Sequence, residues 1–599
     1  MVTRRPIIIR RPTSAILLAA ALLSPAYVCA QGLSGGGNFN NNQGIQHVLL
    51  ISIDGMHSLD FINCASGISG VNGGAPYCPT LAQLKQNGVN YLDTSTSKPS
   101  DSFPGLMAIV SGGSPRSVGA FYDVAYDRSL NPPITTTGNG VAGMPCSPGA
   151  TPPGTTTEFD EGIDIDQTQL NGVSNSTLST FGGGAASIDP NKLPHDRNCQ
   201  PIYPWNFVRT NTIFGVIHKA GGYTAWSDKH PSYSSVSGND PAPGLAPNVN
   251  DYYSPEINSI PIALPGVNAG STSCNPLPDQ TAVASSNAWT DSFQNIQCYD
   301  QLKVNAILNE ALGKTHDGKK AVIPTIFGMN FQSVSVGEKL IEHSTGVTGG
   351  YLDSEGTPSP ALLSEIEFVD GAIGKMVANL KSSGAYQSTL IVITAKHGQS
   401  PIDSARYTGI TAAGPVTTSP ATILDGLGCL PTSESPSNPT GIGPTEDDVS
   451  LVWLNSKCTT ANAVHALETQ SPASANIAGI GELFWGSGIT QLFNAPGLPP
   501  NGDPRTPDIL TTPNIGVTYS GSTKKQAEHG GFAHDDTNVM MLISNPFLPP
   551  KTVTSPVETM QVAPTILAAL GLDPNSLQSV QQEHTEVLPG ISFGQGQDN

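Results

Sequence analysis

Positively charged residues are scarce in this sequence. Its 599 residues contain 27 Lys and Arg against 47 Asp and Glu, which gives a formal net charge of −20 at pH 7. Four of the arginines lie in the first eleven residues, so the remainder is more acidic still. Such a chain lacks the basic surface that attracts nucleic acids and anionic membranes. We therefore expect neither a nucleic acid polymer nor an anionic membrane as its main partner.

Long apolar runs are equally rare, and only the N-terminus carries one. The arginine-rich "MVTRRPIIIRRP" precedes the apolar "TSAILLAAALLSPAYV", and "VCA" places small residues before Gln31. This order is typical of a secretory signal peptide, to which we assign residues 1–30. The alternative is a membrane anchor, which the shortness of the run and its break at Pro25 disfavour. Because no later segment is apolar enough to span a bilayer, we expect a secreted, periplasmic or extracellular protein without an integral membrane segment.

Cysteines are few, and none show the C-x-x-C spacing of a thiolate zinc site. Removal of Cys29 with the signal peptide leaves an even number in an exported chain, which predicts up to four disulfides. The remaining cysteines are Cys64, Cys78, Cys146, Cys199, Cys274, Cys298, Cys429 and Cys458. We expect pairing between sequence neighbours, such as Cys64–Cys78 and Cys429–Cys458.

Most of the chain alternates between apolar strand segments and amphipathic helix segments. Residues 31–44 are expected to be a flexible polar leader, and residues 45–599 a single hydrolase-type domain. Two loop-rich stretches, about 130–205 and 405–525, are expected to be insertions into it. Helices that alternate with apolar strands predict an α/β fold with a mostly parallel sheet sandwiched by helices.

The clearest unit is a helix with apolar residues at helical spacing from Leu362 to Leu380, followed by a strand at 389–394. Another strand is expected at 47–53. Residues 79–94 are predicted as a helix and turn, and residues 321–336 as a strand followed by a loop. Strand carboxyl ends meet at one edge of a parallel sheet, where ligands bind. The polar residues expected at this edge are Asp54, Asp228, Gln332 and His397.

Asp54 and Ser102 are the first candidates for chemistry. Asp54 follows an apolar strand and precedes Gly55, a position that suits either a metal ligand or a turn-capping carboxylate. Ser102 precedes Phe103-Pro104, and a proline fits the first turn of a helix. Near a helix N-terminus, the helix dipole and the free N–H groups would favour an incoming phosphate or a developing alkoxide at Ser102. The alternative is that Ser102 is only the N-cap of that helix.

Histidines in glycine-rich or strand-following loops are the second group of candidates. His397 follows a buried strand, and His529 lies in "AEHGGFAHDD". Together with Asp54 they suit a metal or phosphate site, although a lone histidine is more often structural. Asp228 and His230 lie two residues apart after another strand. They suit a metal, an acid–base pair or simple local hydrogen bonding.

Taken in order, several stretches resemble the type I phosphodiesterase/nucleotide pyrophosphatase family of the alkaline phosphatase superfamily. These stretches span residues 47–575 apart from the two insertions, and read "HVLLISIDGM", "SFPGLMAIVSGGSPRSVG", "FVDGAIGKMVANLKSSGAYQSTLIVITAKHGQ", "EHGGF" and "QVAPTILAALGL". The resemblance implies an alkaline-phosphatase-like fold. It also implies a Ser or Thr nucleophile that is activated by two zinc ions.

Carried over to this sequence, the resemblance makes Ser102 the nucleophile and Asp54, His397 and His529 metal ligands. Three family ligands are missing. The Asp expected before His397 is Lys396, and the Asp-x-x-Gly-His segment is replaced by Gln332 and Val336. Sulfatases, distant relatives, use lysines beside one metal. Here Gly55 follows Asp54 where they have Asp, and "SFPGL" lacks their arginine.

The sequence thus predicts a secreted hydrolase of a phosphodiester or pyrophosphate that uses Ser102, Lys396 and at most one divalent metal, expected to be zinc. Lys396 would supply part of the missing positive charge. Asp228, His230 and Gln332 are expected to bind the small anionic ester substrate. The alternatives are a catalytically silent protein, in which Lys396 forms a salt bridge with Asp54, and a hydrolase of another ester such as sulfate.

Overall fold

The computed structural model describes residues 44–159, 185–258, 289–410, 418–435, 445–473 and 479–593. All of them belong to one unit, Gly35–Asn599. The expected signal peptide and nearly all of the expected leader lie outside the described residues. In the part of the chain that is described, every helix is too short or too polar to cross a bilayer.

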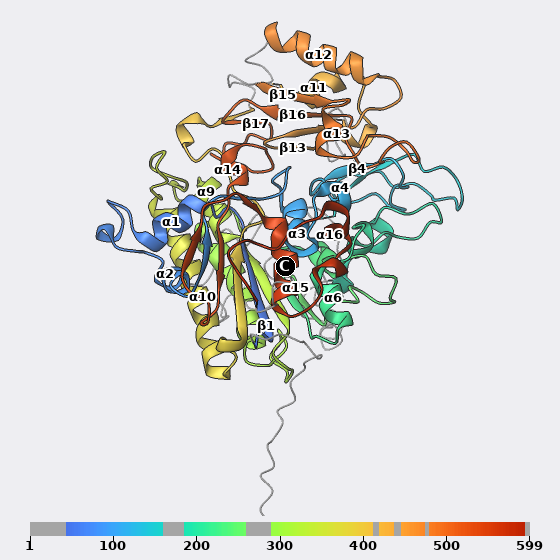
Figure 1. Ribbon diagram of the computed structural model, residues 1–599. Coiled ribbons are helices and arrows are strands. Elements are labelled where there is room, and N and C mark those ends of the chain that lie inside the picture. Colours follow the sequence, from blue (N-terminus) through green and yellow to red (C-terminus); the bar gives the residue numbers. More distant parts are fainter. Residues whose placement is uncertain are drawn as a thin grey trace, which may run out of the picture. The chain divides into compact units, whose positions relative to one another are not determined.

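The centre of the fold is a mostly parallel, eight-stranded sheet (Figure 1). Its strand order is β19-β2-β18-β11-β1-β8-β6-β7, and β18 pairs antiparallel with both of its neighbours. The four strands β11, β1, β8 and β6 run parallel to one another. The bounds are β1 His47–Ile53, β2 Gly88–Tyr91, β6 Ala225–Ser227, β7 Asp251–Tyr253, β8 Ile326–Phe331, β11 Thr389–Thr394, β18 Met541–Ser544 and β19 Lys551–Val553. The prediction of an α/β fold is confirmed.

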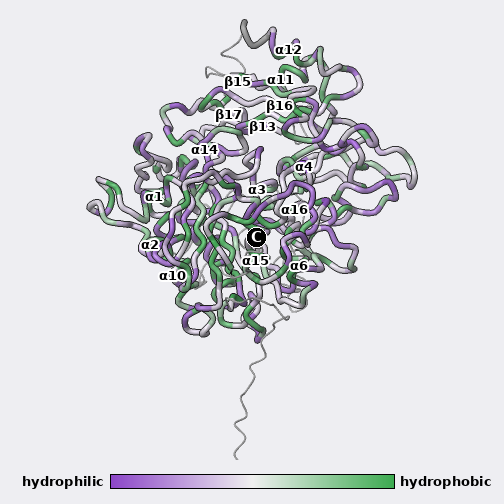
Figure 2. Tube along the Cα trace, in the orientation of Figure 1, coloured by the Kyte–Doolittle hydropathy of each residue, from purple (hydrophilic) through white to green (hydrophobic). Residues whose placement is uncertain are grey.

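Side chains of the central strand β1 alternate between two hydrophobic cores, as a pleated strand requires. Val48 and Leu50 face one core, and Leu49, Ile51 and Ile53 face the other. Because both faces are buried, the apolar residues of β1 form a nearly continuous run, Val48–Ile51 and Ile53, rather than alternating with polar residues. Figure 2 shows hydrophobic residues concentrated along the central strands and the helix α15.

Helices cover both faces of the sheet. Those that contribute to the core of Val48 and Leu50 are α3 Ser102–Ser111, α6 Ile213–Lys219 and α15 Val562–Ala569. Those of the opposite core are α1 Ser58–Ser66, α2 Pro79–Lys85, α8 Phe293–Glu310, α9 Ser333–Lys339 and α10 Pro360–Ser383. Two sequence-based expectations are wrong in detail. The expected turn after α2 contains the strand β2, and the expected loop after β8 is the helix α9.

A smaller antiparallel sheet lies within residues 445–513. Its order is β13-β14-β16-β15, with bounds Thr445–Glu446, Ser450–Val452, Ile509–Pro513 and Ile480–Trp485. The helices α11 Pro420–Asp425 and α12 Thr460–Ala473 contact it. Two-stranded sheets pair β4 Ala125–Asp127 with β5 Thr155–Thr157, β3 Thr94–Ser95 with β20 Val557–Glu558, β9 Ile341–Glu342 with β10 Val347–Thr348, and β12 Thr408–Gly409 with β17 Val517–Thr518.

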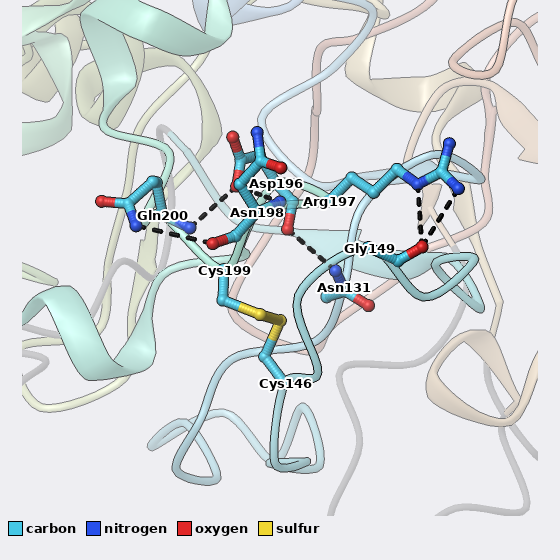
Figure 3. Close-up of a disulfide and its surroundings, with 8 residues drawn as sticks. All are labelled: Asn131, Cys146, Gly149, Asp196, Arg197, Asn198, Cys199 and Gln200. Carbon is cyan, nitrogen blue, oxygen red and sulfur yellow. Dashed lines mark hydrogen bonds between the residues drawn. A yellow bond between two sulfur atoms is a disulfide. The ribbon is translucent and has the colours of Figure 1, made fainter.

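Disulfides close three loops of the described chain. Cys64–Cys78 and Cys429–Cys458, with Cα atoms 5.1 and 5.2 Å apart, are the neighbour pairs expected from the sequence. The third, Cys146–Cys199, joins two loop segments with Cα atoms 5.7 Å apart (Figure 3). Beside it, Arg197 donates from Nε and Nη2 to the carbonyl oxygen of Gly149. Cys298 is disulfide-bonded as well. The prediction of disulfides is confirmed.

A bidentate ion pair links the loop before β16 to the segment before α6. Nη1 and Nη2 of Arg209 each lie 2.6 Å from a carboxylate oxygen of Asp503. Although burial acts in the opposite direction, the hydrogen bonds and charge of Arg209 lower the pKa of Asp503 to about 2. Because the folded pKa is below the unfolded value, the pair stabilises the fold above about pH 4, and its contribution is lost as the pH falls towards 2.

We expect Asp503→Asn to lower the free energy of unfolding by about 1–2 kcal/mol at neutral pH, a value discounted for the partial exposure of Arg209. Urea titrations at pH 7 and pH 3 would measure it, and the difference from the wild type should narrow at pH 3. Asp291→Asn is the matched control, because Asp291 pairs with Lys524 in an exposed ion pair. An equal loss at both pH values would contradict the assignment.

Candidate active site

Polar residues follow four parallel, adjacent strands and meet at one edge of the sheet. Asp54 follows β1, Gln332 follows β8, Asp228 follows β6, and His397 lies three residues beyond β11. Nε2 of Gln332 donates to Oδ2 of Asp54 at 2.5 Å. Nε2 of His397 lies 3.5 Å from the same oxygen. The structure thus places these side chains together, as expected from the strand ends.

Asp54 is a fully buried carboxylate with one unused oxygen. Oδ2 accepts hydrogen bonds from Gln332 and from Nδ2 of Asn330 at 3.1 Å. Oδ1 has no hydrogen-bond partner among the described residues. Burial alone would raise the pKa of Asp54, but the positive charge of Lys396, followed by His397 and Lys229, lowers it well below its usual value. A charged carboxylate with a buried oxygen that lacks a hydrogen-bond partner is suited to bind a cation.

Ser102 is the first residue of helix α3. Asp101, with an extended backbone, is the N-cap, so the alternative that Ser102 caps the helix is wrong. Oγ of Ser102 lies 3.0 Å from Nζ of Lys229 and 3.3 Å from Nε2 of His397. The side chain of Asp123 accepts a hydrogen bond from the backbone N–H of Phe103 at 2.8 Å, which fixes the helix start. The hydroxyl is therefore held between an ammonium group and an imidazole.

The hydrogen bonds of His397 indicate which of its ring nitrogens can accept a hydrogen bond from Ser102. Nδ1 lies 2.8 Å from the carbonyl oxygen of Gly398. A carbonyl oxygen only accepts, so Nδ1 carries a proton, and in the neutral form of the ring Nε2 keeps its lone pair. Ser102 can then accept from Lys229 and donate to His397 simultaneously. This is the arrangement of a serine hydroxyl with an adjacent base.

His529 stacks on His397 with ring centroids 3.9 Å apart. Its Nδ1 lies 2.8 Å from Oε1 of Glu528, and its Nε2 lies 3.5 Å from Oδ1 of Asp101. Burial, reinforced by the charge of His397, lowers the pKa of His529 to about 3. His529 is therefore a neutral ring at neutral pH, and its role as a ligand stays a prediction.

Lys396 does not approach the serine as its position in the sequence suggested. Nζ donates to Oδ1 of Asp228 at 2.9 Å and lies 3.8 Å from the ring centroid of Tyr233. The salt bridge with Asp54 that we associated with a silent protein is therefore formed with Asp228 instead. Oδ2 of Asp228 accepts from Nε1 of Trp226 at 3.1 Å. Both oxygens of Asp228 are thus in use, and its role in binding substrate stays a prediction.

Lys229 is the residue that the sequence analysis missed. It lies in the loop after β6, between the two candidates Asp228 and His230, and only those two were given roles. The rule that collects residues at strand carboxyl ends applies to it equally. Its ammonium group, rather than that of Lys396, contacts the hydroxyl of Ser102.

A cavity of about 380 Å³ opens beside these residues. Lys229, His230, Gln332 and His529 line it, together with Asp101, Tyr122, Asp123, Val124, Ile257, Asn258, Thr290, Asp291, Val336, Lys339, Thr445, Glu446, Asp447, Lys525 and Glu528. Nδ1 of His230 lies 2.7 Å from Oε1 of Glu256. The wall carries three lysines and six carboxylate residues, so an anionic ligand would meet positive charge beside the lysines and not over the wall as a whole. Ser102 itself is fully buried behind Lys229.

The donor atoms at this edge suit a metal ion. Oδ1 of Asp54, Nε2 of His397 and Oγ of Ser102 are N and O donors suited to zinc. In the part of the chain described, Asp54, His397 and His529 do not bring three ligand atoms within 4.8 Å of one another. Val336 has no donor atom, and Nε2 of Gln332 donates to Asp54. The number of ions stays a prediction.

The chain is similar to one known protein family. The family model described as type I phosphodiesterase/nucleotide pyrophosphatase matches residues 48–155 and 342–532. The matched segments include Asp54, Ser102, Lys396, His397 and His529. Members of this family typically depend on divalent metal ions. No curated protein matches the chain.

Solved structures with a similar arrangement include murine ectonucleotide pyrophosphatase/phosphodiesterase 5, at 14% identity over 88% of this chain and 96% of that chain, with a TM-score of 0.48. An inactive form of the murine protein in complex with AMP is 13% identical, with the same coverage of each chain and a TM-score of 0.47. A variant of the alkaline phosphatase PafA is 12% identical over 88% and 95% of the two chains, with a TM-score of 0.49.

Proposed function

We propose, from the premise that this chain belongs to the type I phosphodiesterase/nucleotide pyrophosphatase family, that it is an exported hydrolase of small phosphodiesters or pyrophosphates. Ser102 is its nucleophile, and at most one divalent metal, expected to be zinc, takes part. The observation that carries the proposal is the position of Oγ of Ser102 between Nζ of Lys229 and Nε2 of His397.

Each active-site residue has a separate role in the proposed reaction. As Oγ of Ser102 attacks phosphorus, its proton passes to the lone pair of Nε2 of His397. The ammonium group of Lys229 stabilises the developing alkoxide and then the charge on the phosphoryl oxygens. The bond from phosphorus to the leaving group breaks, and the leaving group departs as an oxyanion. Water then attacks phosphorus and gives up a proton to solvent, and His397 returns its proton to Oγ of Ser102 as the bond between Oγ and phosphorus breaks. Lys396 holds Asp228, and with it the loop that carries Lys229.

A metal ion would be held by Oδ1 of Asp54 and Nε2 of His397, and when bound it lowers the pKa of the nucleophile and neutralises phosphoryl charge. Nε2 of His397 has one lone pair, so it serves either as the base or as a metal ligand. Whether His397 is the base or a metal ligand, Lys229 stabilises the developing alkoxide, since its ammonium group contacts Ser102 directly.

Substrate reaches Ser102 through the cavity that Lys229, His230, Gln332 and His529 line. The side chain of Lys229 must swing from the hydroxyl towards the phosphoryl oxygens as the ester enters. The full burial of Ser102 is the one observation that favours the second candidate function, a silent binding protein on the same fold.

The predicted organisation of the chain is retained as part of the proposal. Residues 1–30 direct export, residues 31–44 are a leader, and residues 45–599 are the hydrolase domain. The segments at about 130–205 and 405–525 are insertions that shape the substrate pocket. The disulfides support an oxidising compartment, where such bonds persist.

Assays with a bis-aryl phosphate, an aryl monophosphate and an aryl sulfate, before and after chelation, test this function. We expect turnover of the diester, and we expect Asp54→Asn to remove at most one equivalent of tightly bound metal per chain, because Asp54 and His397 form only one ligand set. Metal content after exhaustive dialysis gives the second measurement.

Loss of two equivalents in the Asp54→Asn chain would contradict the one-ion proposal. Absence of turnover of every ester, with and without zinc, would favour the silent protein. Preferential turnover of the sulfate would identify the other ester class.

A further inference from the structure

A second cluster of metal-ligating side chains lies outside the candidate active site. Nδ1 of His57 lies 2.9 Å from Oδ2 of Asp60 and 3.3 Å from Oε1 of Glu338. The hydroxyl of Tyr351 lies 2.9, 3.0 and 2.8 Å from these three atoms, respectively. His57, Asp60 and Glu338 are each about 1% exposed. Among the described residues, these three form the group of His, Cys, Asp and Glu with ligand atoms all within 4.8 Å.

The cluster has more negative charge than its protein partners compensate. Asp60 and Glu338 are both buried carboxylates, and among the described residues His57 is the only ion-pair partner of either. Among the described residues, Oε2 of Glu338 is buried without a hydrogen-bond partner. A further positive charge would stabilise a buried pair of carboxylates beside one imidazole.

The other nitrogen of His57 is arranged as in metal-bound histidines. Nε2 lies 2.8 Å from the carbonyl oxygen of Gln399. The backbone N–H of Gln399 also lies 3.0 Å from Nε2 and donates to it when Nε2 is unprotonated. Metal binding through Nδ1 requires the other tautomer, in which Nε2 donates to the carbonyl and Nδ1 presents its lone pair to the two carboxylates and the phenol. A hydrogen bond from the second ring nitrogen to a backbone carbonyl is the usual support of a ligating histidine.

The geometry points to a metal ion at the centre of this cluster, and we propose that His57, Asp60, Glu338 and Tyr351 hold one zinc-class divalent ion. Four ligands at zinc bond lengths lie about 3.3 Å from one another in a tetrahedron. Four of the separations in the cluster are 2.8–3.0 Å, and the fifth, between His57 and Glu338, is 3.3 Å, so the ligand atoms would move apart by a few tenths of an ångström around the ion. One imidazole and three oxygens are a donor set that zinc accepts.

A cavity reaches one of the four proposed ligands, His57. His57 and Ser58 line a cavity of about 450 Å³, together with residues that include Arg406, His534 and Asp535. This cavity shares no lining residue with the one beside Lys229. The ion site is therefore separate from the candidate active site, and its occupancy does not depend on the proposed catalytic roles.

The ion would hold together the segments that carry the active-site residues. His57 lies three residues after Asp54, and its ring contacts Gln399, two residues after His397. Oε2 of Glu338 lies so close to Gly55 that a Cβ there would be 2.3 Å away. Glu338 belongs to α9, the helix that follows Gln332. The ion is thus a structural one that fixes the position of Asp54 and His397.

Zinc content of the full chain tests the proposal. The Asp54→Asn chain, which removes the active-site ligand, is dialysed against buffered zinc and should retain about one equivalent, whereas Asp54→Asn/Glu338→Gln should bind zinc about 10- to 100-fold more weakly. Glu365→Gln in the same background is the matched control, since Glu365 is an equally buried glutamate outside the cluster. Cobalt in place of zinc should give the visible absorption of a four-coordinate site.

Two further outcomes decide the assignment. Tyr351→Phe, which keeps the ring, should weaken zinc binding about 10-fold and lower the melting temperature only when zinc is present. An Asp54→Asn chain that binds no zinc, and whose melting temperature does not rise with added zinc, would overturn the proposal and leave a protonated His57 between the two carboxylates. Loss of zinc in the Glu365→Gln control would also overturn it.

Discussion

Replacement of Ser102 by alanine is expected to lower kcat for a bis-aryl phosphate by about 10³-fold or more, because the step that forms the bond to phosphorus loses its nucleophile. The structure holds the hydroxyl of Ser102 against both Lys229 and His397. Substrate binding relies on the lysines of the cavity wall, so KM should change much less than kcat. Steady-state kinetics of the purified chain would measure both.

Two variants make this result specific to the hydroxyl. Ser102→Thr keeps the hydroxyl and should retain measurable turnover. Ser111→Ala removes a buried hydroxyl from the other end of the same helix, nine residues and therefore about 13 Å away, and should leave kcat unchanged. If Ser102→Ala retained the turnover of the wild type, the nucleophile would be another group.

The edge of the sheet that carries the site was readable from the sequence, because apolar strands followed by a polar residue identify it. The strand β1 is apolar at every position from Val48 to Ile53 except Ser52, and Asp54 follows. The same pattern placed His397 and Gln332 beside it. These inferences depend only on local sequence and on parallel pairing.

Features that depend on distant partners could not be read in the same way. The helix α9 follows β8 where a loop was expected. Its sequence is rich in valine and serine, which are weaker helix formers than alanine or leucine. Its first turn is fixed by Oδ2 of Asp300 on helix α8, which accepts the backbone N–H groups of Gln332 and Ser333 at 2.8 Å. The strand β2 likewise exists through pairing with β18 and β19, more than 400 residues later.

The same limit explains the error over the two lysines. Lys396 stands where the family has an aspartate, so sequence alignment drew attention to it. Residues 156–341, which contain Lys229, fall outside the match to the family, and the stretches that carry the resemblance do not include that residue. Which ammonium group reaches Ser102 is decided by the ion pair of Lys396 with Asp228, a contact across 168 positions of the chain.

Replacement of Lys229 by methionine is expected to lower kcat by about 10²- to 10³-fold, the range seen when one preorganised donor to a developing oxyanion is removed. Methionine keeps the unbranched length of the side chain but has no charge, so the alkoxide of Ser102 loses the donor that lies 3.0 Å away. The rate is measured with the same diester. Lys339→Met is the matched control, because Lys339 also lines the cavity but pairs with Glu528 at 3.7 Å. It should raise KM and leave kcat nearly unchanged.

Lys396→Met separates the two lysines. Removal of Lys396 leaves the fully buried Asp228 without its ion pair, which costs about 3–5 kcal/mol of stability. Its effect should therefore appear as a lower melting temperature, with a fall in kcat that follows from displacement of the loop carrying Lys229. Lys229→Met should lower kcat with a smaller fall in melting temperature than Lys396→Met, since the charge of Lys396 lowers the pKa of the buried Asp54 more than the charge of Lys229 does. The reverse pattern, an unchanged kcat in Lys229→Met and a stable but inactive Lys396→Met, would assign the catalytic charge to Lys396.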